Sequence, residues 1–201
     1  MNSADDERRD RRAGTLGYYW FITFEHASDL HSLTEECQQA IGTTYFYPVS
    51  REGLHLTLDR ISYSGVHAPK QLDLIVTAAR RVGQDQSPFM MTIEQLSNLR
   101  GAIGFKVSPA ERVRGLRDAL RSATLSVFPE APIKDSASDP HVTVAYPASE
   151  DLSAMAAATS ERASTMIRRV DVKVAEVVMV LLERRQHGYW WKAIARIPLA
   201  G

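Results

Sequence analysis

The sequence lacks the features that mark several common protein classes. It has one cysteine, Cys37, among 201 residues, which excludes an internal disulfide framework and any zinc or iron–sulfur site built from several cysteines. We predict that Cys37 is a buried small hydrophobe in a helix. Lys+Arg and Asp+Glu both number 24, so the formal net charge is zero. This balance argues against the broad cationic surface that holds a long nucleic acid, but it is compatible with a small anionic ligand or a short RNA.

Long apolar runs and the common catalytic loops are also absent. No apolar stretch approaches the roughly 20 residues that span a bilayer, and residues 1–12 carry mixed charge rather than the apolar core of a signal peptide. We therefore expect a reduced, cytoplasmic protein with no membrane partner. The chain has no glycine-rich phosphate loop and no G-x-S-x-G elbow, which disfavours a Ser/His/Asp hydrolase even though Asp135, Asp139 and many serines are present.

Short runs of β-branched and aromatic residues alternate with amphipathic stretches along most of the chain. Strands are predicted at 18–24, 45–49, 54–58, 89–96, 102–107, 141–146, 172–182 and 189–197, and helices at 28–41, 69–82, 109–125 and 151–166. Direct hairpins across 98–101 and 186–188 favour antiparallel pairing, so we predict an α+β fold with more than one antiparallel sheet. Residues 1–14 are predicted to form a disordered tail, and residues 15–201 a single domain.

The pattern His-apolar-Thr-apolar occurs twice, as His55-Leu56-Thr57-Leu58 and as His141-Val142-Thr143-Val144. Residues two apart on a strand share a face, so each tetrapeptide shows a histidine and a hydroxyl on one side and two apolar side chains on the other. The apolar side is suited to a core and the polar side to a cleft. Two such strands that face each other place two imidazoles and two hydroxyls in one cleft.

This set of groups suits displacement at phosphorus. One imidazole, with an ordinary pKa near 6.5, accepts a proton from one oxygen while the other donates a proton to a second oxygen. Threonine hydroxyls hydrogen-bond the non-bridging oxygens. No metal is required, and a metal site built on the two histidines lacks the usual third ligand. A single strand histidine is most often structural, so the indication comes from the pair.

The chain resembles the two-histidine (2H) phosphoesterase superfamily, nearest to its 2′-5′ RNA ligase and RNA 2′,3′-cyclic phosphodiesterase-like branch. The residues that carry the resemblance are 54–58, 140–145 and the closing strands 177–182 and 189–198, within an overall match over about residues 16–199. The resemblance implies two pseudo-symmetric lobes, whose antiparallel sheets are flanked by helices, with an active-site groove between them. Residues 15–201 then form one bilobal domain.

The resemblance also implies roles for individual residues. His55 and His141 correspond to the catalytic pair, and Thr57 and Thr143 to the phosphate-binding residues, with no cofactor and no metal. In hydrolysis it favours His55 as the acid and His141 as the base, although the near-symmetry of the motifs leaves both assignments open. Ligase members follow the first motif with a basic and an aromatic residue. This chain has Asp59-Arg60 there, which leaves the substrate identity open.

Other side chains are candidates for substrate contact. Five aromatic residues are able to stack on a base, and they are Tyr19, Phe21, Tyr146, Trp190 and Trp191. We select the first three, and Arg60 as a cation near the phosphate.

We expect a metal-independent phosphodiesterase that hydrolyses 2′,3′-cyclic phosphate or 2′-5′ linkages of RNA or nucleotides and that also catalyses the reverse 2′-5′ ligation. The alternative is a nucleotide- or RNA-end-binding module without useful turnover. The expected partner is a nucleotide or short RNA, and the expected oligomeric state is a monomer without an obligate protein partner.

Overall fold

The computed structural model describes residues 13–63, 69–133, 139–149, 152–164, 168–185 and 188–201. Within these residues the chain forms two antiparallel sheets and four α-helices, which confirms the predicted α+β class. The strands are β1 (Gly14–Thr23), β2 (Phe46–Pro48), β3 (His55–Tyr63), β4 (Phe89–Leu99), β5 (Ala102–Ser108), β6 (His141–Pro147), β7 (Val170–Val174), β8 (Glu176–Arg185) and β9 (Gly188–Pro198). The helices are α2 (Ser28–Ile41), α3 (Pro69–Asp85), α4 (Ala110–Val127) and α5 (Ser153–Ser164), with a 3₁₀ turn, η1, at Arg51–Gly53.

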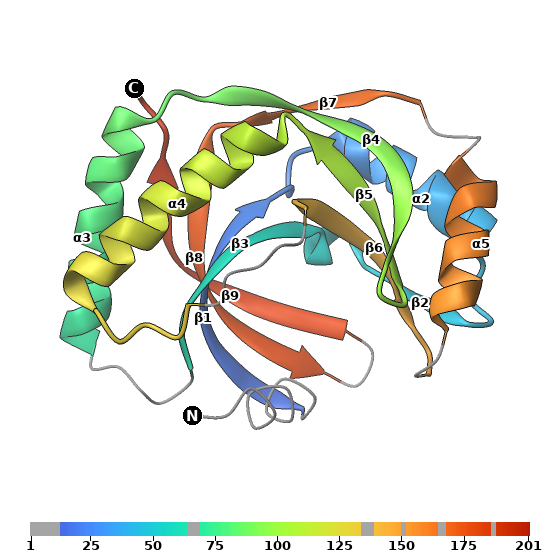
Figure 1. The fold of residues 1–201 in the computed structure, drawn as a ribbon, viewed down its shortest axis with the longest axis horizontal. Coiled ribbons are helices and arrows are strands. Elements are labelled where there is room, and N and C mark those ends of the chain that lie inside the picture. Colours follow the sequence, from blue (N-terminus) through green and yellow to red (C-terminus); the bar gives the residue numbers. More distant parts are fainter. Residues whose placement is uncertain (1–12, 64–68, 134–138, 150–151, 165–167, 186–187) are drawn as a thin grey trace.

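The two sheets form two lobes, each with its own pair of helices (Figure 1). The first sheet has the strand order β3-β1-β8-β9, and helices α3 and α4 pack together against it. The second sheet has the order β2-β6-β5-β4-β7, and helices α2 and α5 pack against it. Strands β3 and β6, which carry the two His-x-Thr motifs, contact each other where the lobes meet. This arrangement confirms the two-lobed architecture implied by the resemblance.

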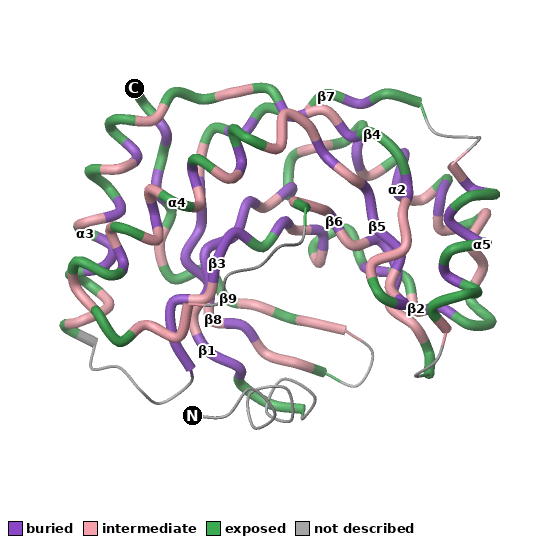
Figure 2. Tube along the Cα trace, in the orientation of Figure 1, coloured by how far each residue is buried: buried purple, intermediate pink, exposed green. Residues whose placement is uncertain are grey.

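Buried residues follow the two sheets and the inner faces of the helices (Figure 2). One large core cluster includes apolar residues of both lobes, among them Trp20, Leu56, Phe105 and Val142. A smaller cluster lies on the other face of the first sheet and consists of Leu16, Tyr19, Phe21, Val178, Val180 and Leu182, with Tyr189 and Trp191 packed against it. Alternation along β1 explains the division, because Trp20 enters the large cluster whereas Tyr19 and Phe21 enter the small one. The small cluster adjoins the first His-x-Thr motif, because Phe21 stacks on His55.

Cys37 is buried in α2, as predicted. Burial raises the pKa of its thiol to about 11, so the sulfur is held as an unreactive thiol. Among the described residues, none of the helices has the length and apolar composition needed to cross a membrane.

Several predicted boundaries need correction, among them the strand expected at 54–58, which continues to Tyr63. The strand expected at 172–182 is two strands, because β7 joins the second sheet and β8 the first, and only Ala175 separates them in the sequence. Helix α3 extends to Asp85 and strand β4 to Leu99, beyond their expected ends. Of the expected disordered tail, residues 1–12 lie outside the described residues, and Gly14 already begins β1.

Candidate active site

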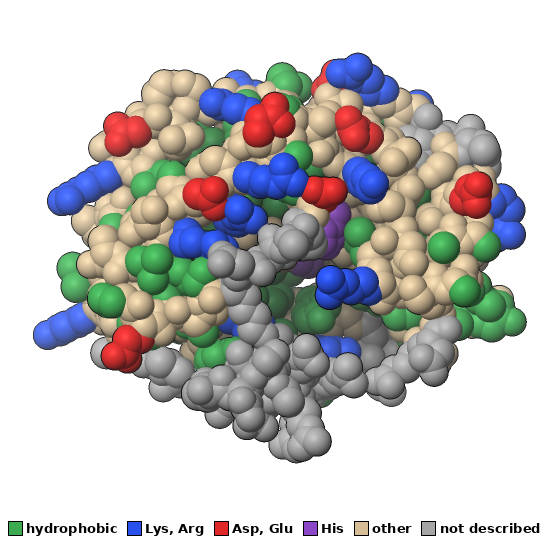
Figure 3. Space-filling model, viewed as in Figure 1, with side chains coloured by type: hydrophobic (Ala, Val, Ile, Leu, Met, Phe, Trp, Pro, Cys, Tyr) green, Lys and Arg blue, Asp and Glu red, His purple; other side chains and the backbone are tan. Residues whose placement is uncertain are grey.

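The four motif residues lie in the wall of one cleft. His55 and Thr57 from β3 and His141 and Thr143 from β6 line a cleft of about 330 Å³ between the lobes. Its remaining wall residues are Leu16, Tyr19, Arg60, Leu99, Ala102, Tyr146, Leu182 and Tyr189, a set without a carboxylate. The space-filling view shows a histidine at the edge of a hollow in the centre of this face, with Lys and Arg side chains around it (Figure 3). We call this space the catalytic cleft, after the acid–base role that we propose below for its two histidines.

Strand β3 reaches the cleft through an irregularity in its pairing. Thr57 and Asp59 face adjacent residues of β1, so Leu58 has no partner in that strand. A residue inserted in this way shifts the alternation of side chains by one position. Arg60 therefore lines the cleft with His55, although regular alternation would place the two on opposite faces.

Strand β6 repeats the same irregularity at the same distance from its histidine. Thr143 and Ala145 face adjacent residues of β5, so Val144 has no partner there. Tyr146 consequently lines the cleft with His141, five residues before it. The two lobes thus present matched triplets, in which a histidine, a threonine two residues on, and a cation or phenol five residues on share one face.

Both imidazoles are oriented by the same backbone contact. His55 Nδ1 lies 2.9 Å from the carbonyl oxygen of Gly53, and His141 Nδ1 lies 2.8 Å from that of Asp139. A carbonyl oxygen only accepts, so Nδ1 donates in both residues. In the neutral form, Nε2 then carries the free lone pair. Each ring thus keeps one nitrogen for the exchange of a proton with a ligand.

Aromatic rings enclose His55. Phe21 stacks on the imidazole with the centroids 4.2 Å apart and the planes inclined by 14°, and Trp191 meets it edge-on at 4.9 Å and 68°. Burial of the ring is the main cause that lowers the pKa of His55 to about 4; the charge of His141 lowers it further, while the hydrogen bond to Gly53 acts in the opposite direction. His55 is therefore neutral at pH 7.

Arg60 is held in the cleft by two phenols. Its Nε donates to Tyr19 Oη at 2.7 Å and its Nη1 to Tyr63 Oη at 2.8 Å. The guanidinium carbon also lies 5.3 Å and 4.7 Å from the centroids of these two rings, within the range of cation–π attraction. The positive charge is thus fixed in place beside the motif residues of β3.

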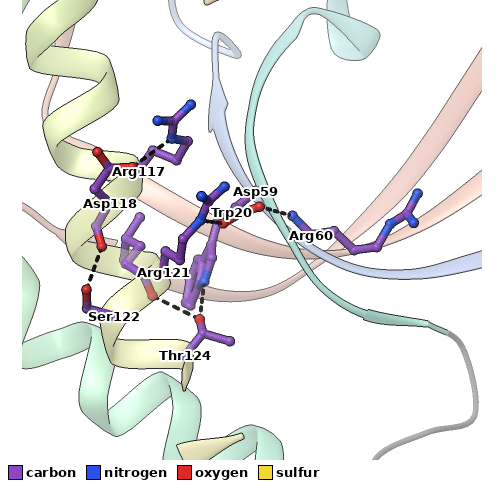
Figure 4. Close-up of polar contacts among 9 residues, drawn as sticks. Trp20, Asp59, Arg60, Arg117, Asp118, Arg121, Ser122 and Thr124 are labelled. Carbon is purple, nitrogen blue, oxygen red and sulfur yellow. Dashed lines mark hydrogen bonds and ion pairs between the residues drawn. The ribbon is translucent and has the colours of Figure 1, made fainter. Parts of the chain in front are cut away.

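An ion pair behind the cleft joins β3 to α4 (Figure 4). Asp59 Oδ2 accepts from Arg121 Nε at 2.7 Å, and Asp59 Oδ1 accepts from the backbone N–H of Arg60 at 3.0 Å. Next to this pair, Trp20 Nε1 donates to Thr124 Oγ1 at 3.1 Å. Asp59 follows the unpaired Leu58 directly, so this contact anchors the strand where its register shifts.

Tyr146 forms part of the wall with Tyr189, with the ring centroids 5.3 Å apart and the planes at 67°. Burial raises the pKa of the Tyr146 phenol, which also hydrogen-bonds Thr143, so this residue is a neutral wall group.

The structure places the other candidate contacts in different positions. Tyr19, Arg60 and Tyr146 line the catalytic cleft, whereas Phe21 is 0% exposed and lies behind His55. Sequence reasoning did not single out Tyr189 as a wall residue. The available signal was the alternation along β9, which puts Tyr189 on the face of Trp191.

Comparisons with known proteins agree with this geometry. The family model of the 2′-5′ RNA ligase superfamily matches residues 23–186. Among solved structures, TT0787 of Thermus thermophilus has a TM-score of 0.70 at 16% sequence identity, with 92% of this chain and 99% of that chain covered. E. coli LigT complexed with 3′-AMP has a TM-score of 0.68 at 15% identity, with 93% and 99% covered. A comparison with the curated proteins found no match.

Two sheets that each bring a histidine and a threonine to a shared cleft have the architecture of a two-histidine phosphoesterase. Because the family model covers most of its length, the chain belongs to the 2′-5′ RNA ligase superfamily within that class. This confirms the family resemblance drawn from the two motifs. At 15–16% identity, the two solved structures show the shared fold alone.

Proposed function

We propose that this protein is a phosphodiesterase that opens 2′,3′-cyclic phosphates or cleaves 2′-5′ linkages in RNA or nucleotides, with His55 and His141 as its acid–base pair. The observation that carries the proposal is the pair of imidazoles in one cleft, each with Nδ1 engaged by a backbone carbonyl. Each ring therefore offers Nε2 to the ligand. One accepts a proton and the other donates one in the same displacement.

In hydrolysis of a cyclic phosphate, a water oxygen attacks phosphorus and one histidine takes the proton of that water. The bond from phosphorus to one ribose oxygen breaks, and the other histidine protonates that oxygen. The product is a phosphomonoester with a free ribose hydroxyl. Thr57 and Thr143 donate hydrogen bonds to the non-bridging oxygens, and Arg60 supplies positive charge beside them. When the 5′-hydroxyl of a second ribose replaces water as the nucleophile, one histidine takes its proton, the bond from phosphorus to O3′ breaks, the other histidine protonates O3′, and a 2′-5′ linkage forms. Excess water favours hydrolysis.

The walls of the catalytic cleft suit a nucleotide. Tyrosine rings are available to stack on its base, Arg60 is available to its phosphate, and none of the described wall residues is a carboxylate that would repel it. The solved LigT structures include complexes with 3′-AMP, NADP+ and ATP. These complexes are those of LigT, and they support nucleotides as the ligand class to test here. No cofactor and no metal enter the proposed steps.

A panel of substrates tests the proposal. The panel contains 2′,3′-cyclic mononucleotides, an RNA oligonucleotide with a 2′,3′-cyclic phosphate end and a 2′-5′-linked dinucleotide, with the products identified by mass spectrometry. We expect a phosphomonoester or a cleaved linkage with the wild-type protein and none with the variant that carries both His55→Ala and His141→Ala. Saturable binding without product from any member would contradict the proposal and identify a binding module.

A further inference from the structure

A second cleft lies directly beside the catalytic cleft. It has a volume of about 390 Å³ and is lined by Pro48, Val49, Ser50, Gly53, Tyr146, Arg185, Gly188, Tyr189 and Trp190. We call it the side cleft. Its walls come from the segment between β2 and η1, from β6, and from the β8 and β9 ends of their hairpin. Tyr146 and Tyr189 line both clefts, so their two packed rings form the partition between them.

The walls of the side cleft suit a ligand that is both planar and anionic. The described wall residues include no carboxylate, and the nearest carboxylate to Arg185 in an ion pair is that of Glu183, 3.8 Å from its Nη2. The Arg185 guanidinium carbon lies 4.8 Å from the centroid of the Trp190 ring. The guanidinium carbon of the preceding residue, Arg184, lies 5.8 Å from the centroid of the Tyr189 ring. Aromatic rings beside arginine are the groups that stack on bases and neutralise phosphates in single-stranded nucleic acid.

Trp190 differs from the other tryptophans in its exposure. Trp20 is 1% exposed and hydrogen-bonded in the core, and Trp191 packs edge-on against His55, whereas Trp190 is 42% exposed. Isolated exposed apolar residues are ordinary. This one lines a concave site together with two tyrosines and an arginine, and its free surface is available to a ligand.

The side cleft is also continuous with the catalytic machinery. Gly53, whose carbonyl orients His55, lies in its wall, and Tyr146 belongs to the strand of His141. Each cleft is at the lower end of the 300–1,000 Å³ typical of ligand pockets. One nucleotide unit therefore suits each cleft, and the tyrosine partition lies between two consecutive units.

We propose that the side cleft binds the nucleoside that precedes the reacting nucleotide, so that the substrate class is an RNA strand end of at least two nucleotides rather than a mononucleotide. This inference rests on the proposed function and makes its substrate specific. The terminal cyclic phosphate and its nucleoside occupy the catalytic cleft. The preceding base packs against the aromatic wall of the side cleft, and the phosphate between the two units lies near Arg185.

The test compares a 2′,3′-cyclic mononucleotide with a dinucleotide that ends in the same cyclic nucleotide. We expect a higher kcat/KM for the dinucleotide with the wild-type protein. Trp190→Ala and Arg185→Ala should lower the dinucleotide value by roughly 5- to 100-fold, the loss expected for one base stack, and so reduce the preference. Ile194→Ala is the matched control. Ile194 lies on the same strand with 41% exposure and is not in the wall of either cleft.

Binding gives a second readout that does not require turnover. Calorimetry with a dinucleotide 3′-phosphate and a mononucleotide 3′-phosphate should show tighter binding of the dinucleotide, and Trp190→Ala should remove the difference. If the wild-type protein turns over neither cyclic substrate, the proposed function fails while this binding result still decides the inference. Equal handling of both lengths by the wild-type protein, or an equal loss for both lengths in the variants, would overturn it. Unchanged thermal midpoints exclude misfolding as the cause.

Discussion

Phe21 lies almost flat against His55, with the two rings 4.2 Å apart between centroids and inclined by 14°. Phe21 is fully buried and Trp191 covers another side of the same imidazole, so the charged form of His55 loses part of its hydration. The titratable or charged groups that share the cleft with His55 are His141, Arg60, Tyr19, Tyr146 and Tyr189. Desolvation by the aromatic rings thus lowers the pKa of one member of the proposed acid–base pair.

Trp191→Leu should move the acid side of the pH–rate profile to higher pH. We expect kcat/KM to be bell-shaped, with its acid limb set by the His55 pKa of about 4. The acid limb reports this pKa whichever histidine is the acid, because the rate follows the fraction of molecules in which the pair carries one proton. Removal of the indole admits water, and the pKa of His55 then rises toward its ordinary 6.5. Titration of the imidazole protons by NMR measures the same shift, and an unmoved limb would contradict the role of Trp191.

The same pKa makes the stability of the fold depend on pH. Between pH 6.5 and about 4, the unfolded chain binds a proton at His55 that the folded chain does not bind. The free energy of unfolding therefore falls as the pH falls through this window. His55→Gln should remove that contribution and flatten the curve. Urea titrations of both proteins at several pH values provide the measurement, and identical curves would show that His55 has its ordinary pKa in the folded protein.

The two histidines should behave as one unit. His55→Ala and His141→Ala should each lower kcat by roughly 10²–10⁴, the usual loss when a general acid or base is removed. The double variant should lose much less than the product of the two factors, because one half of the pair is of little use alone. Thr57→Ala and Thr143→Ala should cost less and affect KM more, since a hydroxyl holds the phosphate in both the ground and transition states.

Single-turnover rates and thermal midpoints on the same preparations test these expectations for the histidine pair. Histidines that only stabilise their strands would give variants with lower midpoints but near-normal rates in the folded fraction. Well-folded single variants that retain more than about a tenth of the wild-type rate would remove both residues from the acid–base role.

The ion pair between Asp59 and Arg121 should contribute strongly to stability, because the two side chains are only 8% and 16% exposed. Asp59→Ala should lower the free energy of unfolding by roughly 3–5 kcal/mol, since it leaves a buried guanidinium without its carboxylate. Arg117→Ala breaks a pair with Asp118, whose side chain is 59% exposed, and should cost only about 0–1 kcal/mol. Urea unfolding of Asp59→Ala, Arg121→Ala and the variant with both changes gives the coupling energy of the pair, and Arg117→Ala is the exposed control. Equal losses of unfolding free energy in Asp59→Ala and Arg117→Ala would contradict the strong contribution expected of the Asp59–Arg121 pair.

Chelation should leave the activity unchanged. The cleft offers two histidines, two threonines, an arginine and tyrosines, a set without the carboxylates or thiolates that usually complete a divalent-metal site. Exhaustive dialysis against EDTA should therefore preserve kcat on a cyclic phosphate. Activity that is lost and then returns on addition of a divalent ion would overturn the metal-independent mechanism.

The sequence predicts the two motif strands and their buried faces well, because alternation is a local property of a strand. It also indicates Arg60 and Tyr146 as candidate contacts, and both line the cleft. Regular alternation does not explain their position, because the shifts at Leu58 and Val144 are defined only by pairing with distant strands. Phe21 is correctly placed in a strand, but its complete burial behind His55 depends on β9, which is remote in sequence. The division of 172–182 between two sheets likewise depends on partners rather than on local composition.

Strands β3 and β6 touch but belong to different sheets, and in the described part of the chain no strand pairing joins those sheets. The distance between the two imidazoles is therefore set by side-chain packing across a seam and not by a hydrogen-bonded register. Such a seam transmits any separation of the lobes directly to the reacting atoms, while each sheet and its helices stay intact. A small shift of one lobe against the other should therefore change the reaction rate before it changes the content of helix and strand.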